Sequence, residues 1–138
     1  MTRKNARIKA KNAHKTGLLG ERIALFWLFL KGYKCLNTRY KTPVGEIDLV
    51  VQPRFLNRKT ICFVEVKHHM GLEQAAQSIS NTQKQRIVRA SQMWMQNNPA
   101  YANHDQRFDA LLLHGKGLTL RLQHLKNAWS IDQIGHNF

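Results

Sequence analysis

The sequence predicts an α/β domain, and three observations lead to that fold class. Residues 45–51 and 60–67 alternate in polarity and carry β-branched and aromatic side chains, which is typical of two strands. Ser80 and Gln83 have the spacing of a capping box, which predicts a helix that runs to about Asn97. The expected order of elements is helix, three strands, helix and two strands, and this order favours an α/β domain.

The other elements are expected from local patterns. A helix at 17–30 would end at Lys31 and Gly32, with glycine in the C-cap position. The remaining expectations are a strand at 33–40, a short helical piece at 72–78, a loop at 98–106, and a hairpin with strands at 108–114 and 118–125. At 138 residues the chain is expected to form one domain, over 17–138.

The charge of the chain points to an anionic partner. Its 22 Lys and Arg residues against 8 Asp and Glu give a formal net charge of +14. Nucleic acid is the partner that such an excess favours. An anionic membrane surface and a merely solubilising surface are the alternatives that charge alone leaves open.

Residues 1–16 are predicted to form a flexible basic arm. They carry six Lys or Arg residues, no acid and one large aliphatic residue, Ile8, so they bury little surface on folding. The arm could contact phosphate backbones or act as a solubilising tail. It lacks the apolar region of a secretory signal.

Two further patterns bear on location and assembly. The apolar run 23–30 is far too short to cross a bilayer, so we expect no membrane span and a helix buried on most sides. A second copy of the chain, in a homodimer, is one candidate for covering part of it. Cys35 and Cys62 have no CxxC spacing and are expected to be buried thiols in a reducing compartment, which favours the cytoplasm.

The two central strands carry most of the candidate chemistry. If they form a hairpin whose loop centres near Leu56 and Asn57, Asp48 lies opposite Glu65 and Glu46 opposite Lys67. Directly opposed side chains on one face have Cβ atoms about 5 Å apart. Three carboxylates and one ammonium would then share one patch.

Carboxylates on a nucleic-acid-binding surface repel phosphate unless a cation lies between them, so this patch suggests a metal site. Mg²⁺ takes one or two carboxylates and fills its other positions with waters, carbonyls and phosphate. Asp48 and Glu65 could bind such an ion, and Lys67 could orient the attacking water. A cross-strand network of salt bridges on a solvated sheet face is the alternative.

Two helical residues are candidates to complete the site. Glu21 lies on the apolar stripe of Leu18, Leu25 and Leu28, where a carboxylate needs a cation or a hydrogen-bond partner. The alternative is an exposed place in the first helical turn. Lys84 begins the buried stripe of the later helix and could lean toward the site or extend into solvent.

These residues carry a resemblance to a known family. With Glu21 on a preceding helix, the spacing Asp48…Glu65-Val66-Lys67 resembles the core of the PD-(D/E)XK nuclease superfamily, which includes archaeal Holliday-junction resolvases. Within it, the chain from Gly17 to about Trp129 resembles the small bacterial YraN family. The matching stretches are residues 17–24, 32–33, 37–39, 45–49, 63–67, 84–86, 107–109 and 127–129.

The resemblance implies a restriction-endonuclease-like αβββαβ core, with a mixed central sheet flanked by helices, and Mg²⁺-dependent hydrolysis of DNA, with Mn²⁺ as a substitute. Asp48, Glu65 and the backbone carbonyl of Val66 would bind the metal, Glu21 would bind it through water, and Lys67 would activate the nucleophile. It ranks Glu46 below Glu21, as a secondary candidate. The residues expected to contact nucleic acid are Arg39, His69, Lys84, Arg86 and Arg89.

Three functional hypotheses follow. The first is a metal-dependent endonuclease that acts on DNA, plausibly at branched or junction structures, in the bacterial cytoplasm. The second is a non-catalytic module that holds DNA or RNA on a basic surface. The third is a subunit that cuts only in complex with a protein partner.

Overall fold

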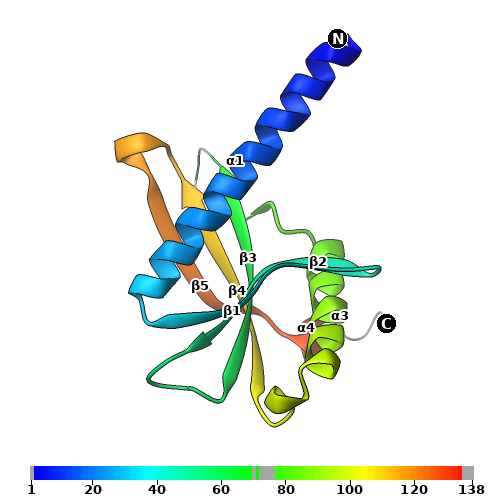
Figure 1. Cartoon of the computed structure of the whole chain (residues 1–138), viewed down its shortest axis with the longest axis vertical. Coiled ribbons are helices and arrows are strands. Elements are labelled where there is room, and N and C mark those ends of the chain that lie inside the picture. Colours follow the sequence, from blue (N-terminus) through cyan, green and yellow to red (C-terminus); the bar gives the residue numbers. More distant parts are fainter. Residues whose placement is uncertain (1, 70, 72–76, 135–138) are drawn as a thin grey trace.

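The protein is a mixed α/β structure built around one five-stranded sheet (Figure 1). The computed structural model describes residues 2–69, 71 and 77–134. In chain order the elements are α1 (Arg3–Leu30), β1 (Tyr33–Thr42), β2 (Gly45–Pro53), β3 (Thr60–His69), α3 (Asn81–Asn97), η1 (Pro99–Tyr101), β4 (Asp105–His114), η2 (Gly117–Thr119), β5 (Arg121–Trp129) and α4 (Ile131–Ile134). The expected α/β class and the mixed sheet flanked by helices are confirmed.

The strands lie in their order along the chain, from β1 to β5. All neighbouring pairs are antiparallel except β3 and β4, which are parallel and are joined through α3. A parallel pair needs such a crossover connection. β3 is the middle strand, and its residues from Ile61 to Glu65 are all buried.

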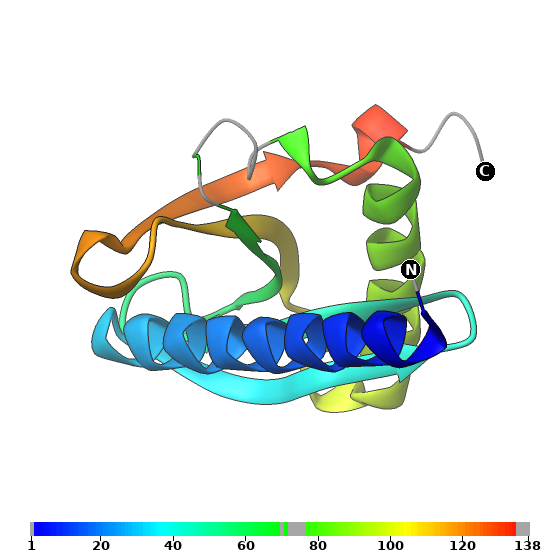
Figure 2. The same ribbon diagram turned by 90° about the horizontal axis from the view of Figure 1, so that it is seen from above.

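Two apolar clusters fix the helices on the sheet. One packs against α3 and includes Ile47, Val50, Phe63, Ile87 and Trp94. The other packs against α1 and includes Ala24, Leu28, Leu49, Val64 and Leu111. Figure 2, seen from above, shows the two helices along different sides of the molecule. Each helix can therefore bring side chains to the sheet from its own side.

Helix α1 begins earlier than the sequence predicted. It starts at Arg3, not at Gly17, so residues 3–16 are helical in place of the expected irregular arm. The Oγ1 of Thr2 caps the helix by accepting a hydrogen bond from the amide of Asn5 at 3.3 Å. The segment is rich in Ala, Lys and Arg, which have high helix propensity. The prediction of an irregular arm rested on the lack of apolar residues, which indicates how little surface the segment buries but not whether it is helical. In Figure 1 this half of α1 projects past the sheet.

Burial along α1 also differs from the prediction. The run 23–30 is not buried on most sides: Ala24 and Leu28 are fully buried, while Phe26, Phe29 and Leu30 are more than half exposed. One face of the helix packs on the sheet. Phe26, Phe29 and Leu30 lie on its exposed side, where the guanidinium of Arg54 lies 4.7 Å from the centre of the Phe29 ring. Cys62 is buried as expected, but Cys35 is exposed because it lies on the edge strand β1.

The remaining boundaries differ by a few residues. The loop expected at 98–106 contains the short helix η1, and β4 already begins at Asp105. The last strand was expected at 118–125 but lies at Arg121–Trp129, because η2 occupies the turn. The helical piece expected at 72–78 falls largely outside the described residues. Across the described part of the chain, no helix is long and apolar enough to cross a membrane.

The turn between β1 and β2 is held tightly against α3. The Oγ1 of Thr42 accepts hydrogen bonds from the amides of Val44 and Gly45, at 3.2 and 3.0 Å, and donates to the carbonyl of Gly45 at 2.7 Å. A Cβ added to Gly45 would lie 2.5 Å from the carbonyl oxygen of Arg86 in α3. Only glycine allows this approach, which sets the start of β2 against the first turns of α3.

We therefore expect Gly45→Ala to lower the free energy of unfolding by about 1–3 kcal/mol, because the backbone of α3 must move away. Urea denaturation followed by circular dichroism measures this. Gly17→Ala is the matched control: it lies in α1 with open space around the added Cβ, so it should be neutral or stabilising by up to about 1 kcal/mol. Equal stability of the two variants would contradict the close contact.

Candidate active site

The candidate site lies where β2 and β3 separate. Their pairing consists of Leu49 with Val64, Val50 with Phe63 and Val51 with Cys62, which is the register predicted for the hairpin. One further step would place Asp48 opposite Glu65. Instead of a backbone pair, the Oδ2 of Asp48 accepts a hydrogen bond from the amide of Val66 at 2.8 Å. The side chain of Asp48 thus occupies the opening between the two strands.

Glu65 is almost completely buried at this opening, with 5% of its surface exposed. Its Oε1 accepts a hydrogen bond from the side-chain amide of Gln83 at 2.6 Å. The Nζ of Lys67 lies 3.3 Å from the same oxygen. Side chains two residues apart share a face of a strand, and this brings the two β3 residues together as predicted. Gln83 reaches them from the first turn of α3.

Glu21 approaches the site from α1. Its Oε2 lies 3.5 Å from the Nε of Arg39 on β1, and its side chain is mostly buried. The exposed first-turn position that the sequence left open is wrong, because α1 begins at Arg3 and Glu21 lies well inside it. Glu21 is close enough to Asp48 for the negative charge of Asp48 to raise the pKa of Glu21.

The carboxylates of the site resist ionisation together. Burial raises the pKa of Glu65 to about 8, and the neighbouring negative charge of Asp48 adds to this. Burial also raises the pKa of Asp48, although the Val66 amide opposes the shift. The pKa of Glu21 is raised by burial first and by Asp48 next. Crowded carboxylates of this kind are stabilised by a nearby cation.

The donor set fits Mg²⁺. Asp48 and Glu65 supply hard oxygen ligands from adjacent strands, and Mg²⁺ is commonly bound by one or two carboxylates. Within the described part of the chain, no three His, Cys, Asp or Glu residues are placed together to hold a metal. A site of two carboxylates completed by backbone oxygen and water is therefore the arrangement that these residues could form.

The secondary candidate Glu46 is exposed and lies beside the site. Its negative charge contributes to the raised pKa values of Asp48 and Glu21. It lines a polar cavity of about 670 Å³ together with Lys41, Gln83 and Arg86. The ion pair found for Lys67 is with Glu65, so the alternative pairing of Glu46 with Lys67 is not the one observed.

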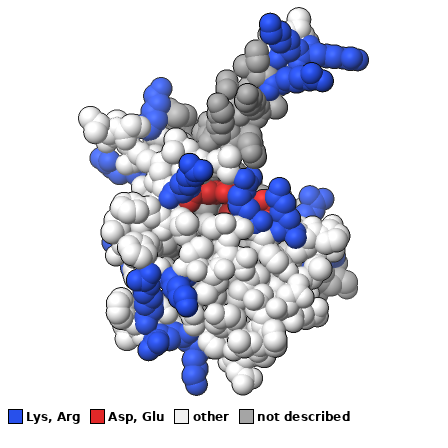
Figure 3. All heavy atoms as spheres, in the orientation of Figure 1, with Lys and Arg blue, Asp and Glu red and all other residues white. Residues whose placement is uncertain are grey.

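The basic residues expected at the site are spread around it. Arg86 and Arg89 are exposed on α3, and His69 is exposed at the end of β3. Lys84 does not lean toward the carboxylates: its Nζ lies 5.9 Å from the centre of the Trp129 ring. On the face drawn in Figure 3, the visible acidic atoms form a short strip with Lys and Arg atoms close around it.

Gln83 is the residue that sequence reasoning missed. One of the two hydrogen bonds of the predicted capping box is present: the Oγ of Ser80 accepts a hydrogen bond from the backbone amide of Gln83 at 3.1 Å. The side chain of Gln83, which the box would send back to Ser80, bonds Glu65 instead. The only signal in the sequence was a polar residue in the first turn of the helix that follows β3.

A second polar network was also not predicted. Asp109 is fully buried on β4 and accepts hydrogen bonds from Arg107, at 2.9 and 2.8 Å, and from the Asn127 amide at 3.0 Å. The Nε2 of His124 lies 2.7 Å from its Oδ2. Burial raises the pKa of Asp109, but these donors outweigh it and lower the pKa overall. The negative charge of this carboxylate is therefore already balanced by donors within the fold.

The geometry defines a class: a mixed α/β protein with two largely buried carboxylates and a lysine at the separating ends of two central strands. The chain belongs to UPF0102, an uncharacterised protein family, whose sequence pattern matches residues 20–113. A UPF0102 protein of Rhodopseudomonas palustris (strain BisB5) is 44% identical over 117 residues, which cover 85% of this chain and 84% of the relative. A UPF0102 protein of Bradyrhizobium diazoefficiens is 42% identical over 106 residues, which cover 77% of this chain and 77% of the relative. A UPF0102 protein of Nitrobacter winogradskyi is 39% identical over 110 residues, which cover 80% of this chain and 90% of the relative.

The raised pKa of Glu65 predicts a pH-dependent stability. The pKa of Glu65 is 4.5 in the unfolded chain and about 8 in the folded protein, so the folded protein binds this proton more tightly. As the pH rises from 4.5 to 8, ionisation of Glu65 therefore makes folding less favourable. Without metal, Glu65→Gln should gain stability over the wild type by roughly 2–4 kcal/mol more at pH 9 than at pH 5.

Thermal melts of both proteins in EDTA, at unit pH steps, measure this difference. Asp105→Asn serves as the control, because it removes an exposed carboxylate that pairs with Thr60 at the other end of β3 from Glu65, and the pH dependence of its stability should follow that of the wild type. A constant difference between Glu65→Gln and the wild type at all pH values would show that Glu65 ionises freely.

Proposed function

We propose that this protein is a metal-dependent endonuclease of the PD-(D/E)XK superfamily that hydrolyses phosphodiester bonds in DNA. The observation that carries the proposal is the meeting of Asp48, Glu65 and Lys67 at one opening of the sheet, within a chain of net charge +14. In a basic protein, buried carboxylates that remain hard to ionise are best explained as ligands for a cation.

The fold is compatible with the proposed superfamily. The order α1, β1, β2, β3, α3, β4 contains the αβββαβ sequence of the restriction-endonuclease-like core, and β5 adds a strand beyond β4. Glu21 on the first helix, Asp48 on the second strand and Glu65 with Lys67 on the third occupy the positions that the resemblance implies. These correspondences support the superfamily assignment as a proposal.

In the proposed mechanism, Asp48, Glu65 and the carbonyl of Val66 would hold Mg²⁺, or Mn²⁺ in its place. The bound metal would polarise a phosphoryl oxygen and lower the pKa of a bound water. The ammonium of Lys67 would hold the attacking water by a hydrogen bond and offset the negative charge that develops on phosphate.

Other residues would position this group. Gln83 restrains Glu65 through its bond to Oε1. The Val66 amide restrains Asp48 in the same way. Arg39 holds Glu21, which would contact the metal through water.

The surroundings of the site suit DNA. Lys41 and Arg86 line the cavity that reaches Glu46 and Gln83, and Arg89 and His69 lie on neighbouring elements. Such groups would bind phosphates on either side of the scissile bond. We propose branched or junction DNA in the bacterial cytoplasm as the substrate. The exposed Phe26 and Phe29 are a proposed contact for a second copy of the chain or for a protein partner.

One observation favours the alternative of a non-catalytic binding module. Lys67 already lies against Glu65, so part of the negative charge is balanced without a metal. A protein of this kind would bind nucleic acid with steep salt dependence and form no products. Measurements of metal binding and of cleavage separate these functions.

Metal binding should stabilise the fold. We expect 5 mM Mg²⁺ or Mn²⁺ at pH 8 to raise the melting temperature of the wild type by several degrees, since a ligand that binds only the folded state adds to its stability. Asp48→Asn should lose most of this shift, because the amide removes the negative charge. Asp105→Asn, which removes an exposed carboxylate at the other end of β3, is the matched control and should retain the shift. A wild type that gains nothing from either ion contradicts the metal site.

Cleavage should depend on the same residues. We expect Mg²⁺-dependent products from at least one of linear, flapped, single-stranded and four-way DNAs, resolved on denaturing gels. Asp48→Asn, Glu65→Gln and Lys67→Met should each slow cleavage by about 100-fold or more, the usual scale for a lost transition-state contact. DNA binding should be unchanged or tighter. Lys59→Gln removes an exposed cation just before β3, at the end of that strand away from Lys67, and should cleave normally. Cleavage that survives both carboxylate substitutions would falsify the assignment.

A further inference from the structure

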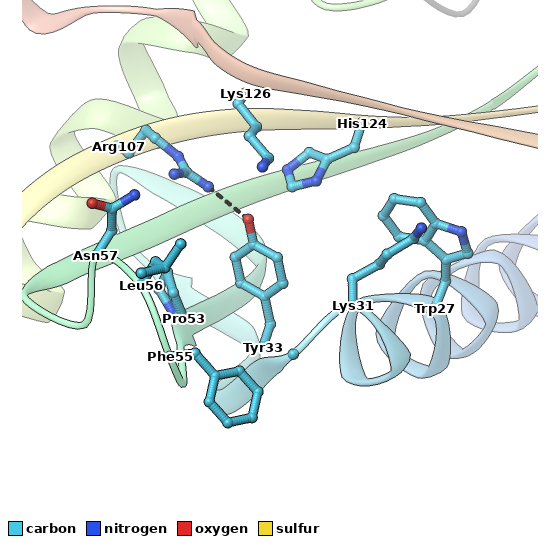
Figure 4. A pocket seen from close by; sticks show the side chains of 11 residues that line it. Trp27, Lys31, Tyr33, Pro53, Phe55, Leu56, Asn57, Arg107, His124 and Lys126 are labelled. Atoms are coloured by element: carbon cyan, nitrogen blue, oxygen red, sulfur yellow. Dashed lines mark hydrogen bonds between the residues drawn. The ribbon is translucent and has the colours of Figure 1, made fainter.

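A second cavity lies at the C-terminal ends of α1 and β2, beyond the carboxylates. Its volume is about 510 Å³, and it is bounded by the last turns of α1, the start of β1, the end of β2 and its loop, and strands β4 and β5 (Figure 4). Lys31 in its wall is ten residues beyond Glu21 on α1, which corresponds to about 15 Å along a helix. The cavity is therefore separate from the carboxylate site but close to it.

Aromatic rings form the walls of this cavity. The ring of His124 packs edge-on against Trp27 and Tyr33, with ring centres 5.9 and 5.8 Å apart, so these walls are fixed by one another. At the rim, Phe55 and Leu56 are 77% and 82% exposed. Figure 4 shows Phe55 and Leu56 beside Tyr33, on the side of the cavity away from Lys31 and Trp27. Large apolar side chains left in solvent beside a cavity are typical of a binding surface.

Positive charge accompanies the rings. Lys31, Arg107 and Lys126 line the cavity, and none of the described residues that line it is acidic. The Nη2 of Arg107 donates a hydrogen bond to the hydroxyl of Tyr33 at 3.0 Å, drawn as the dashed line in Figure 4, while Asp109 holds the same guanidinium from behind. Because Asp109 balances Arg107, the excess charge comes from Lys31 and Lys126.

This combination selects a ligand with a flat apolar part and an anionic part. The Nζ of Lys31 already lies 5.3 Å from the centre of the Trp27 ring, so the exposed ring of Phe55 is the one open to a ligand. An inorganic anion would leave this ring unused, and an uncharged apolar molecule would bring no anion for Lys31 and Lys126. A nucleotide has both parts, since its base stacks on aromatic side chains and its phosphate attracts Lys and Arg. The volume lies within the range usual for sites that bind small ligands.

We propose that this cavity binds one unpaired nucleotide of a single-stranded nucleic acid. A base within a duplex is stacked and paired on both sides and cannot enter, so the cavity would distinguish single strands from duplex. The binding site itself does not depend on cleavage. If the protein is the nuclease proposed above, on which this step rests, the nucleotide site implies a substrate with a single-stranded segment a few nucleotides from the scissile bond.

The binding experiment uses the full chain in EDTA, so that no cleavage can occur. Fluorescence anisotropy at 0.15 M salt compares a labelled single-stranded oligothymidylate with a labelled duplex of the same length. We expect Phe55→Ala to weaken single-strand binding about tenfold, the effect of losing one stacked base, and to change duplex binding less than twofold. Lys126→Gln should weaken single-strand binding about threefold and reduce its salt slope by about 0.7.

Two control variants match these changes outside the cavity. Leu118→Ala removes an exposed apolar side chain and Lys116→Gln an exposed cation, both from the β4–β5 turn, and neither should affect single-strand binding by more than twofold. Equal losses for single strand and duplex in Phe55→Ala, or no loss in either, would overturn the proposal. Unchanged melting temperatures of the variants show that the fold is intact.

The position of the bound base can be tested directly. A single strand that carries 5-iododeoxyuridine should cross-link under ultraviolet light to Trp27, Tyr33 or Phe55, as read by mass spectrometry, and cross-links only to other residues would place the base elsewhere. A protein that binds in this way but cuts no DNA with Mg²⁺ would disprove hydrolysis and leave the cavity intact. A protein that cuts DNA with no role for Phe55 would disprove the cavity alone.

Discussion

The separation of β2 from β3 after the Leu49–Val64 pair is the constraint on which the candidate active site depends. A regular ladder would continue with Asp48 opposite Glu65 and would bond the Val66 amide to the backbone of β2. In this structure the side chain of Asp48 takes the Val66 amide that would otherwise remain unsatisfied. One hydrogen bond therefore ends the strand pairing and fixes a carboxylate beside a second, buried carboxylate. Because both strands continue beyond this point, their separation leaves an opening between them that a phosphate group could reach.

The helices complete this opening from two directions. α1 supplies Glu21 from one side of the sheet, and α3 supplies Gln83 from the other. The close contact between Gly45 and the backbone of α3 keeps the start of β2 and the first turns of that helix together. The distances between Asp48, Glu65 and Gln83 therefore depend on the packing of a turn that contributes no functional side chain.

Asp109 and Glu65 show how differently one fold treats two buried carboxylates. Asp109 accepts hydrogen bonds from a guanidinium and a backbone amide and lies against a histidine ring nitrogen, so its pKa is lowered despite burial. Glu65 has one amide and one ammonium beside it but faces Asp48, so its pKa rises to about 8. The first is a completed structural element that joins β4 to β5. The second still lacks positive charge, which is the physical basis for proposing a cation there. The aromatic cavity shares Arg107 with the completed network, which makes its wall rigid.

The sequence by itself determined the α/β class, the order of the elements and the register of the central hairpin. Alternation in two strands of known spacing fixes which residues face each other, so this pattern alone is enough to bring Asp48, Glu65 and Lys67 together. It did not determine the start of α1, the exposure of Cys35 or the direction of the Lys84 side chain, because these depend on which neighbours pack against them. It also missed Gln83, whose side chain had a local partner in the capping box and a distant one in Glu65. Only tertiary packing brought α3 against β3 and decided between them, because the pattern of a helix shows which face is buried but not which strand residue each side chain meets.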